Sequence, residues 1–145
     1  MMYIKQLNVF VENRHGRLEE VYSILAKNDI NVISTTISDV SEYGLIRMVV
    51  SDPHLAKEVL SAEDYSASLT DVLAVKLPNK VGSLQRLIQV LTFGGVTISY
   101  LYTMATGEAS ASMVVKVSES DRALEALEEN GFEVFSAEEA YAITA

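Results

Sequence analysis

The chain has 145 residues, of which 49% are hydrophobic and 21% are charged, and its net charge is −9. These proportions indicate a folded globular protein, and the negative charge with scattered basic residues argues against nucleic acid as a partner. The chain contains no Cys, which excludes disulfide bonds and thiol catalysis.

The start of the chain lacks the features of a secretory signal, and no apolar run approaches the roughly 20 residues that cross a bilayer. We therefore expect a cytoplasmic protein with no membrane partner. The two His are far apart, and no residues cluster with the spacing of metal ligands. We accordingly expect no metal site, no cofactor and no catalytic site.

The first half of the chain alternates between the periods of strands and helices. Leu7, Val9 and Val11 recur every second residue and predict a strand, whereas the apolar stripe of residues 18–25 predicts a helix. The remaining elements of this half are β-branched strands over residues 30–40 and 44–50, a helix over 52–61 with Asp52 as N-cap and Pro53 in its first turn, and a closing strand around 65–69.

The same pattern returns 66 positions later, where Leu73, Val75 and Leu77 predict a strand and residues 84–91 a helix. Next come predicted strands over 96–104 and 110–117, a helix over 118–130 capped from Ser118 or Ser120 and ended by Asn130 and Gly131, and a closing strand over 132–136. Aligning Met48–Val50 with Met113–Val115 predicts that the second hairpin is one residue shorter than the first.

The two halves are thus duplicates of one unit, and each follows the order strand, helix, strand, strand, helix, strand of ferredoxin-like domains. We predict an α+β protein with two βαββαβ units in tandem, residues 1–70 and 71–145, whose antiparallel sheets pair side by side. Two helices should cover one face of each sheet. The acidic pairs Glu19–Glu20, Glu128–Glu129 and Glu138–Glu139 should lie on solvated faces.

The loop between the first strand and first helix of each unit carries an Asn, a basic residue, a Gly and a Leu in the same order. Gly16 and Gly82 let the backbone turn there, and the first N–H groups of the helix attract an anion. Asn13 and Asn79 offer both a donor and an acceptor. Such a loop can bind a zwitterion but cannot break a covalent bond. Alternatively, the Gly only turns, the Asn caps the helix, and Leu18 or Leu84 begins the core stripe.

The segments ENRHGRL with NDINV, and PNKVGSL with GGVTI, resemble the signature of ACT domains. The resemblance covers the whole chain and is greatest to small proteins made of two ACT units, where DVSEYGLIRMVVSDP is similar to a segment of the first unit. It implies that the units bind free amino acids where the glycine loop of one unit faces the second strand of another. It implies these ligand residues: Asn13, His15, Gly16, Arg17, Leu18, Asn31, Ile33, Asn79, Val81, Gly82, Ser83, Leu84, Thr97 and Ser99.

Two departures from the ACT pattern affect this expectation. The loop Pro of the family is replaced by His15 and Val81, which leaves the loops less preorganised. The Asn found eighteen residues after the loop Asn in serine-binding relatives is present as Asn31, whereas the second copy has Thr97. We therefore expect two unequal sites.

The resemblance predicts a regulatory module that senses a free amino acid for an enzyme of amino-acid metabolism, and that is not itself an enzyme. An alternative is a structural or protein-interaction module without a ligand. The edge strands left by two four-stranded units make a homodimer a reasonable expectation.

Overall fold

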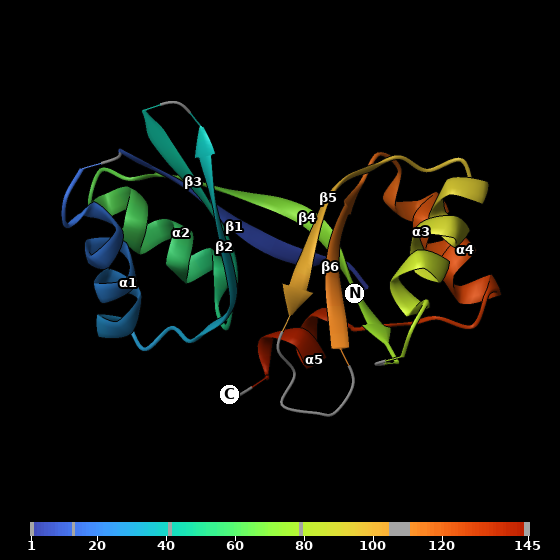
Figure 1. Ribbon diagram of the computed structural model, residues 1–145. Coiled ribbons are helices and arrows are strands. Elements are labelled where there is room, and N and C mark those ends of the chain that lie inside the picture. Colours follow the sequence, from blue (N-terminus) through green and yellow to red (C-terminus); the bar gives the residue numbers. More distant parts are fainter. Residues whose placement is uncertain (1, 13, 41, 79, 105–110, 144–145) are drawn as a thin grey trace. The chain divides into compact units, whose positions relative to one another are not determined.

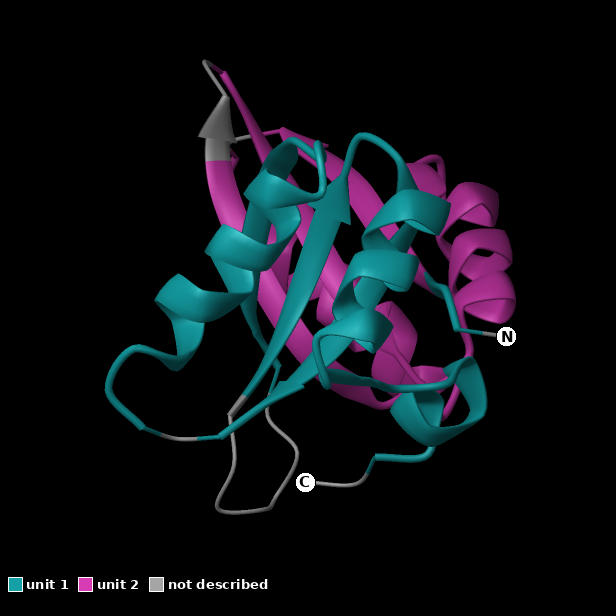
Figure 2. Ribbon diagram, turned by 90° about the vertical axis from the view of Figure 1, so that its right-hand side faces the viewer, with its two compact units in different colours: residues 1–4, 71–143, 145 teal, residues 5–70, 144 magenta. Residues whose placement is uncertain are grey.

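The computed structural model describes residues 2–12, 14–40, 42–78, 80–104 and 111–143 (Figure 1). The chain forms two compact units, one of residues 5–70 and one in which residues 71–143 are joined by the first few residues of the chain (Figure 2). Met2 and Tyr3 pack against the core of the latter unit, where the Tyr3 hydroxyl donates to the Asp121 carboxylate.

The unit of residues 5–70 has the predicted βαββαβ order. Its elements are β1 (Ile4–Glu12), α1 (Arg17–Lys27), β2 (Val32–Val40), β3 (Tyr43–Val50), α2 (Pro53–Ala62) and the first part of β4 (Ser66–Leu77). The strand order is β2-β3-β1-β4, with β3 antiparallel to both β1 and β2. The ferredoxin-like arrangement expected from the sequence is therefore confirmed.

The unit of residues 71–143 repeats this order. The second part of β4 is followed by α3 (Ser83–Phe93), β5 (Ile98–Met104), β6 (Ala111–Val117), α4 (Ser120–Glu129) and β7 (Glu133–Val134). Strand β4 pairs with β6 on one side and β7 on the other, and β5 pairs with β6, all antiparallel. A short helix that we did not predict, α5 (Ala137–Tyr141), completes the unit.

Strand β4 serves both units. We expected two strands, around 65–69 and over 73–77, but residues 66–77 form one strand of 12 residues. No Pro or Gly interrupts this segment, so nothing in it prevents the backbone from staying extended. The closing strand of one unit is thus continuous with the opening strand of the other.

The predicted alignment of the two hairpins is wrong by two residues. Strand pairing places Thr35 opposite Met48, and Leu101, which is 66 positions after Thr35, opposite Val115. Met48 therefore corresponds to Val115, and the second copy gains a residue in this region. A slip of two residues keeps every side chain on the same face of a strand, so the apolar pattern cannot detect the error.

Each unit has its own apolar core between the sheet and its two long helices. In the unit of residues 5–70 the core includes Leu7, Val9, Val11, Val21, Leu25, Ile46, Met48, Val50, Ala56 and Leu60. In the other unit it includes Leu73, Val75, Leu77, Leu87, Leu91, Met113, Val115, Val117, Ala123 and Leu127. The strand and helix periods in the sequence thus predicted most of both cores.

The helix caps were predicted only in part. Asp52 caps α2 as expected, since its carboxylate accepts from the Leu55 N–H at 3.1 Å. Helix α4 instead begins after Glu119, without a side-chain cap, so the prediction of a cap from Ser118 or Ser120 is wrong. The Ser118 hydroxyl accepts from the Thr97 N–H at 3.0 Å and joins the start of β5 to the end of β6.

Polar residues occupy the sheet face opposite the helices in the unit of residues 5–70. Gln6 is fully buried and donates to Asn8 at 2.6 Å, and Asn8 donates to the hydroxyls of Ser68 at 3.2 Å and Thr70 at 2.7 Å. These bonds satisfy amide groups that are costly to bury without partners. Sequence analysis did not identify this network.

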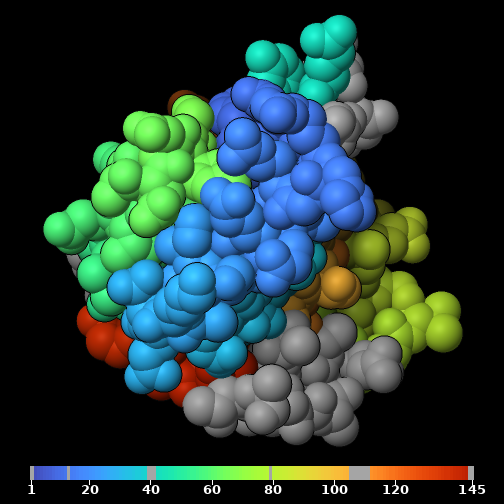
Figure 3. All heavy atoms as spheres, turned by 90° about the vertical axis from the view of Figure 1, so that its left-hand side faces the viewer, coloured from blue at the N-terminus to red at the C-terminus, as the bar shows by residue number. Residues whose placement is uncertain are grey.

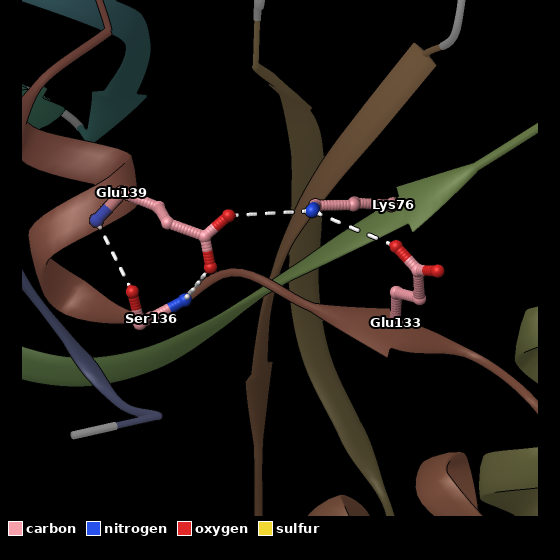
Figure 4. A network of polar contacts seen from close by, with 4 residues as sticks. All are labelled: Lys76, Glu133, Ser136 and Glu139. Carbon is pink, nitrogen blue, oxygen red and sulfur yellow. Dashed lines mark hydrogen bonds and ion pairs between the residues drawn. The ribbon is translucent and has the colours of Figure 1, made fainter.

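Helix α5 lies against the sheet face opposite the long helices of its unit. Lys76 of β4 points to that face, because its neighbours Val75 and Leu77 point into the core. Its ammonium lies 3.4 Å from the Glu139 carboxylate of α5 and 3.6 Å from that of Glu133 on β7 (Figure 4). Glu139 is exposed, as we predicted for the acidic pairs, but it has defined partners.

Candidate ligand site at two glycine bends

Both predicted loops contain a left-handed glycine immediately before a helix. Gly16 precedes α1 with φ of 86°, and Gly82 precedes α3 with φ of 89°. A Cβ built on either glycine would meet nothing within 4 Å, so the constraint is the backbone conformation and not a lack of space. Only Gly adopts this conformation without strain, which explains why both copies have it.

The two bends have matching backbone hydrogen bonds. The Arg17 N–H donates to Arg14 O at 3.2 Å, and the Ser83 N–H donates to Lys80 O at 3.2 Å. One turn later, Glu20 and Arg86 donate to the carbonyls of the two glycines. Duplication has therefore preserved the conformation of the bend.

In the first turn of the helix after each bend, two consecutive N–H groups have no hydrogen-bond partner among the described residues. They belong to Leu18 and Glu19 in α1, and to Leu84 and Gln85 in α3. Neither helix has a side-chain cap from the described residues. These N–H groups and the positive end of the helix dipole form a site that favours an anionic group.

The side chains around the bends are mostly exposed. Leu18 and Leu84 are 42% and 41% exposed, so the alternative in which they begin the core stripe is wrong. His15 is exposed, and Val81 is fully exposed. Asn13 and Asn79, to which we assigned the polar contacts, lie outside the described residues.

Arg17 has partners within its own unit. Its guanidinium lies 3.8 Å from the Glu20 carboxylate, which also accepts from the Tyr65 hydroxyl at 2.8 Å. Contact with Tyr65, more than with Glu20, raises the pKa of Arg17 above its usual value, so the guanidinium stays charged. The corresponding residue in the other bend is Ser83, which is partly buried.

Within a unit, the predicted strand residues lie far from the bend. Asn31 and Thr97 follow the helices that begin at Gly16 and Gly82. Each helix has 11 residues and is therefore about 16 Å long. A unit thus does not bring its own bend and its own strand start together.

Two serines fix these strand starts, and the sequence analysis did not assign this role to either of them. The Ser51 hydroxyl accepts from the Asn31 N–H at 2.9 Å, and the Ser51 N–H donates back to Asn31 O at 3.0 Å. Ser118 makes the same pair of bonds with Thr97. In the sequence, the feature that could have indicated these bonds is a Ser directly after the third apolar strand of each copy.

Ile33 and Ser99 lie at irregularities in strand pairing. The register shifts between Val32 and Ser34 in β2, and between Ile98 and Tyr100 in β5. Bulges of this kind redirect side chains and often occur beside functional sites. Both copies have the irregularity at the same position, so it belongs to the repeated unit.

A hollow of about 260 Å³ lies beside the Gly16 bend. It is lined by Val11, Glu12, Arg14, Leu18, Ile37, Gly44 and Ile46. Figure 3 faces this unit and shows α1, in blue, exposed on its surface. A larger hollow of about 500 Å³ lies in the other unit and includes Ser83.

The described residues include no candidate for a metal site or a membrane span. Among the described residues, no group of three or more His, Cys, Asp or Glu is arranged to hold a metal ion. In the same part of the chain, no helix is both long and apolar enough to cross a membrane.

Comparisons with known proteins agree with this fold. A family model described as an ACT domain pair matches residues 2–143. The crystal structure of protein BT0572 from Bacteroides thetaiotaomicron has 35% sequence identity and a TM-score of 0.92, over 97% of each chain. No curated protein matches the chain.

Two regulatory subunits of aspartate kinase are more distant structural neighbours. Those from Thermus thermophilus and Thermus flavus have TM-scores of 0.61 and 0.63 with 18% and 19% identity. The alignments cover 89% of this chain, and 94% and 93% of theirs. At this identity the likeness shows the fold alone.

Proposed function

Because this chain belongs to the ACT domain pair family, we propose that it is a non-catalytic regulatory module that binds a free amino acid. Residues 1–70 and 71–145 are taken as its two ACT domains. The observation that carries the proposal is the pair of unpartnered N–H groups at each glycine bend. These groups match the carboxylate of an amino acid in charge and direction.

The remaining contacts are proposed to come from an opposing unit. Asn31 and Ile33, or Thr97 and Ser99, would face a bend across the joint between two units, and Asn13 or Asn79 would hold the ammonium group. The bulges and the paired serine bonds support this assignment, because they hold both strand starts in the same conformation. The joint that includes Asn31 has an amide that the joint with Thr97 lacks, so the two sites are unequal.

Regulation is proposed to act on another chain. The Thermus neighbours are named as regulatory subunits of aspartate kinase, and an enzyme of amino-acid metabolism is the corresponding target here. A cytoplasmic homodimer is the proposed assembly. Amino acid binding would regulate the target if the two arrangements of the units differ in ligand affinity.

A thermal-shift screen of the twenty amino acids tests the proposal. A ligand at 100 times its dissociation constant adds about 2.7 kcal/mol of stability, which gives a clear rise in Tm. We expect a rise with one amino acid or a few related ones. Asn31→Ala should reduce this rise more than Thr97→Ala, because it removes the amide of the stronger site.

A second candidate is an interaction module without a ligand. The observation that favours it is the exposed apolar face of α3, which includes Leu84, Ile88 and Phe93. No rise in Tm with any amino acid would support this alternative and contradict the first.

A further inference from the structure

The hollow of about 500 Å³ lies entirely within the unit of residues 71–143. It is bounded by the end of β4, the first turn of α3 and the turn between α4 and β7. Its lining comprises Lys76, Leu77, Pro78, Ser83, Arg86 and residues 130–133. Its volume is within the range of about 300–1,000 Å³ that is typical of small-molecule sites.

Arg86 is the lining residue with an unmatched charge. Its guanidinium donates to Asn130 O at 3.0 Å and lies 5.5 Å from the centre of the Phe132 ring. Among the described residues, no carboxylate lies within 4.0 Å of it. The guanidinium is thus oriented by a carbonyl and an aromatic ring, and its charge has no acidic partner in the part of the chain that the structure describes.

Lys76 and Glu133, which also line the hollow, do not neutralise the charge of Arg86 or add a second available cation. The Lys76 ammonium lies close to the carboxylates of Glu133 and Glu139, so the positive charge of Lys76 is already compensated (Figure 4). Burial alone would lower the pKa of Lys76, but the contacts with Glu139 and Glu133 together raise it above its usual value. Lys76 therefore stays protonated and holds Glu133, leaving Arg86 as the cation available to a ligand.

The other unit provides an internal comparison, because Glu20 occupies the position equivalent to Arg86 there. Tyr65 and Arg17, which correspond to Phe132 and Ser83, both interact with that carboxylate. The cluster in the unit of residues 5–70 thus contains its own acid. In the unit of residues 71–143 the acid is replaced by a cation, and the hydroxyl of the aromatic residue is absent.

We propose that this hollow binds a small organic carboxylate. The ligand carboxylate supplies the acid that the cluster lacks, and Arg86 binds it through two parallel N–H donors. The Ser83 hydroxyl donates a third hydrogen bond, and the apolar body of the ligand packs against Leu77, Pro78 and Phe132. This site belongs to a single unit, and it shares Ser83 with the candidate residues at the Gly82 bend.

Hexanoate is a suitable probe, with hexan-1-ol and inorganic phosphate as matched comparisons. Amide NMR spectra of the full chain would be recorded during titration with each compound. Saturable shifts of Ser83, Gly131 and Phe132 are expected with hexanoate. Hexan-1-ol lacks the charge and phosphate lacks the apolar body, so both should bind at least about tenfold more weakly.

Variants of Arg86 complete the test. Arg86→Gln should weaken hexanoate binding at least about tenfold, whereas Arg86→Lys should retain part of it because the charge remains. Arg122→Gln is the control, since Arg122 lies on α4 of the same unit, is 57% exposed and pairs with Glu119. Unchanged Tm values would show that the Arg86 variants remain folded.

A double variant gives the unit of residues 71–143 the acidic residue and the tyrosine that the other unit has at the equivalent positions. Arg86→Glu combined with Phe132→Tyr should abolish hexanoate binding without unfolding the chain. The proposal would be overturned if hexanoate gave no saturable shifts, if it bound Arg86→Gln as tightly as the wild type, or if phosphate bound as tightly as hexanoate.

Discussion

Single residues determine the conformation of the candidate site. The turns at Gly16 and Gly82 were predictable from the sequence, and the structure shows that both glycines have a positive φ. Arg86 was not predicted as a ligand residue. Its importance is evident only when the two units are compared, because one unit has an acidic residue at the position where the other has a basic one. Gln6 and Asn8 were not identified either, because a polar residue in an apolar strand looks solvent-facing until its partners are known.

Replacing either glycine by alanine tests the residue-scale account. Gly16→Ala and Gly82→Ala should each lower the free energy of unfolding by about 1 kcal/mol, because the left-handed conformation is strained for alanine. Urea unfolding would measure the change. Gly44→Ala is the matched control, since its Cβ would make ordinary contacts of 3.8 Å or more and should cost little. Equal costs at all three positions would contradict the assignment of strain to the bends.

At the scale of elements, the sequence predicted helices and strands wherever a period was long and unbroken. It failed for α5, which has only five residues and too few turns to show a helical stripe. The available signal was local: Ser136 and Glu139 form a capping box, in which each side chain bonds the backbone N–H of the other. We predicted two strands in place of β4, because the segment that the two units share carries polar residues where the alternating apolar residues of a core strand were expected.

The position of α5 should depend on pH. The hydrogen bond from the Ser136 N–H has the largest effect on the pKa of Glu139 and the contact with Lys76 the next largest. Both hold this pKa below its ordinary value of 4.5. The stabilising contribution is therefore present above pH 4.5 and is lost as the pH falls through the lower pKa of the folded state. Amide NMR signals of Ala140 and Tyr141 should move towards unfolded values over this acidic range.

Two glutamine variants test whether Glu139 or its neighbour causes the acid dependence of the α5 signals. Glu139→Gln keeps a capping side chain but has no carboxyl group to titrate, so the α5 signals should lose most of their acid dependence. Glu138→Gln should remove less of it, because a backbone hydrogen bond also lowers the pKa of Glu138 but the Lys76 contact belongs to Glu139. If both variants titrated like the wild type, another group would be responsible.

At the scale of the whole molecule, duplication explains what the sequence predicted and what it did not. The 66-residue offset revealed two ferredoxin-like units and most of both cores. We predicted one residue fewer in the second hairpin, whereas it has one more. The apolar pattern of a strand does not change when the alignment slips by two residues, so it could not reveal this error. The ligand contacts stay a prediction, since the strand proposed to face each bend belongs to another unit.

Unfolding of the two units should be coupled through β4, which runs unbroken from one to the other. Leu25 and Leu91 are equivalent core residues that are 1% and 0% exposed. Leu25→Ala and Leu91→Ala should each cost about 3 kcal/mol, and each should destabilise the chain in a single transition. Amide signals from each unit, followed through urea unfolding, would measure this. Separate midpoints for the two units would contradict the coupling.

We propose that the free N–H groups of the glycine bends hold an amino acid. Amide NMR titration of the full chain with the amino acid that gives the largest rise in Tm tests this most directly. We expect saturable shifts to be largest at Leu18 and Glu19, or at Leu84 and Gln85, with the two bends saturating at different concentrations. Saturation that leaves all four of these amides unmoved would contradict it.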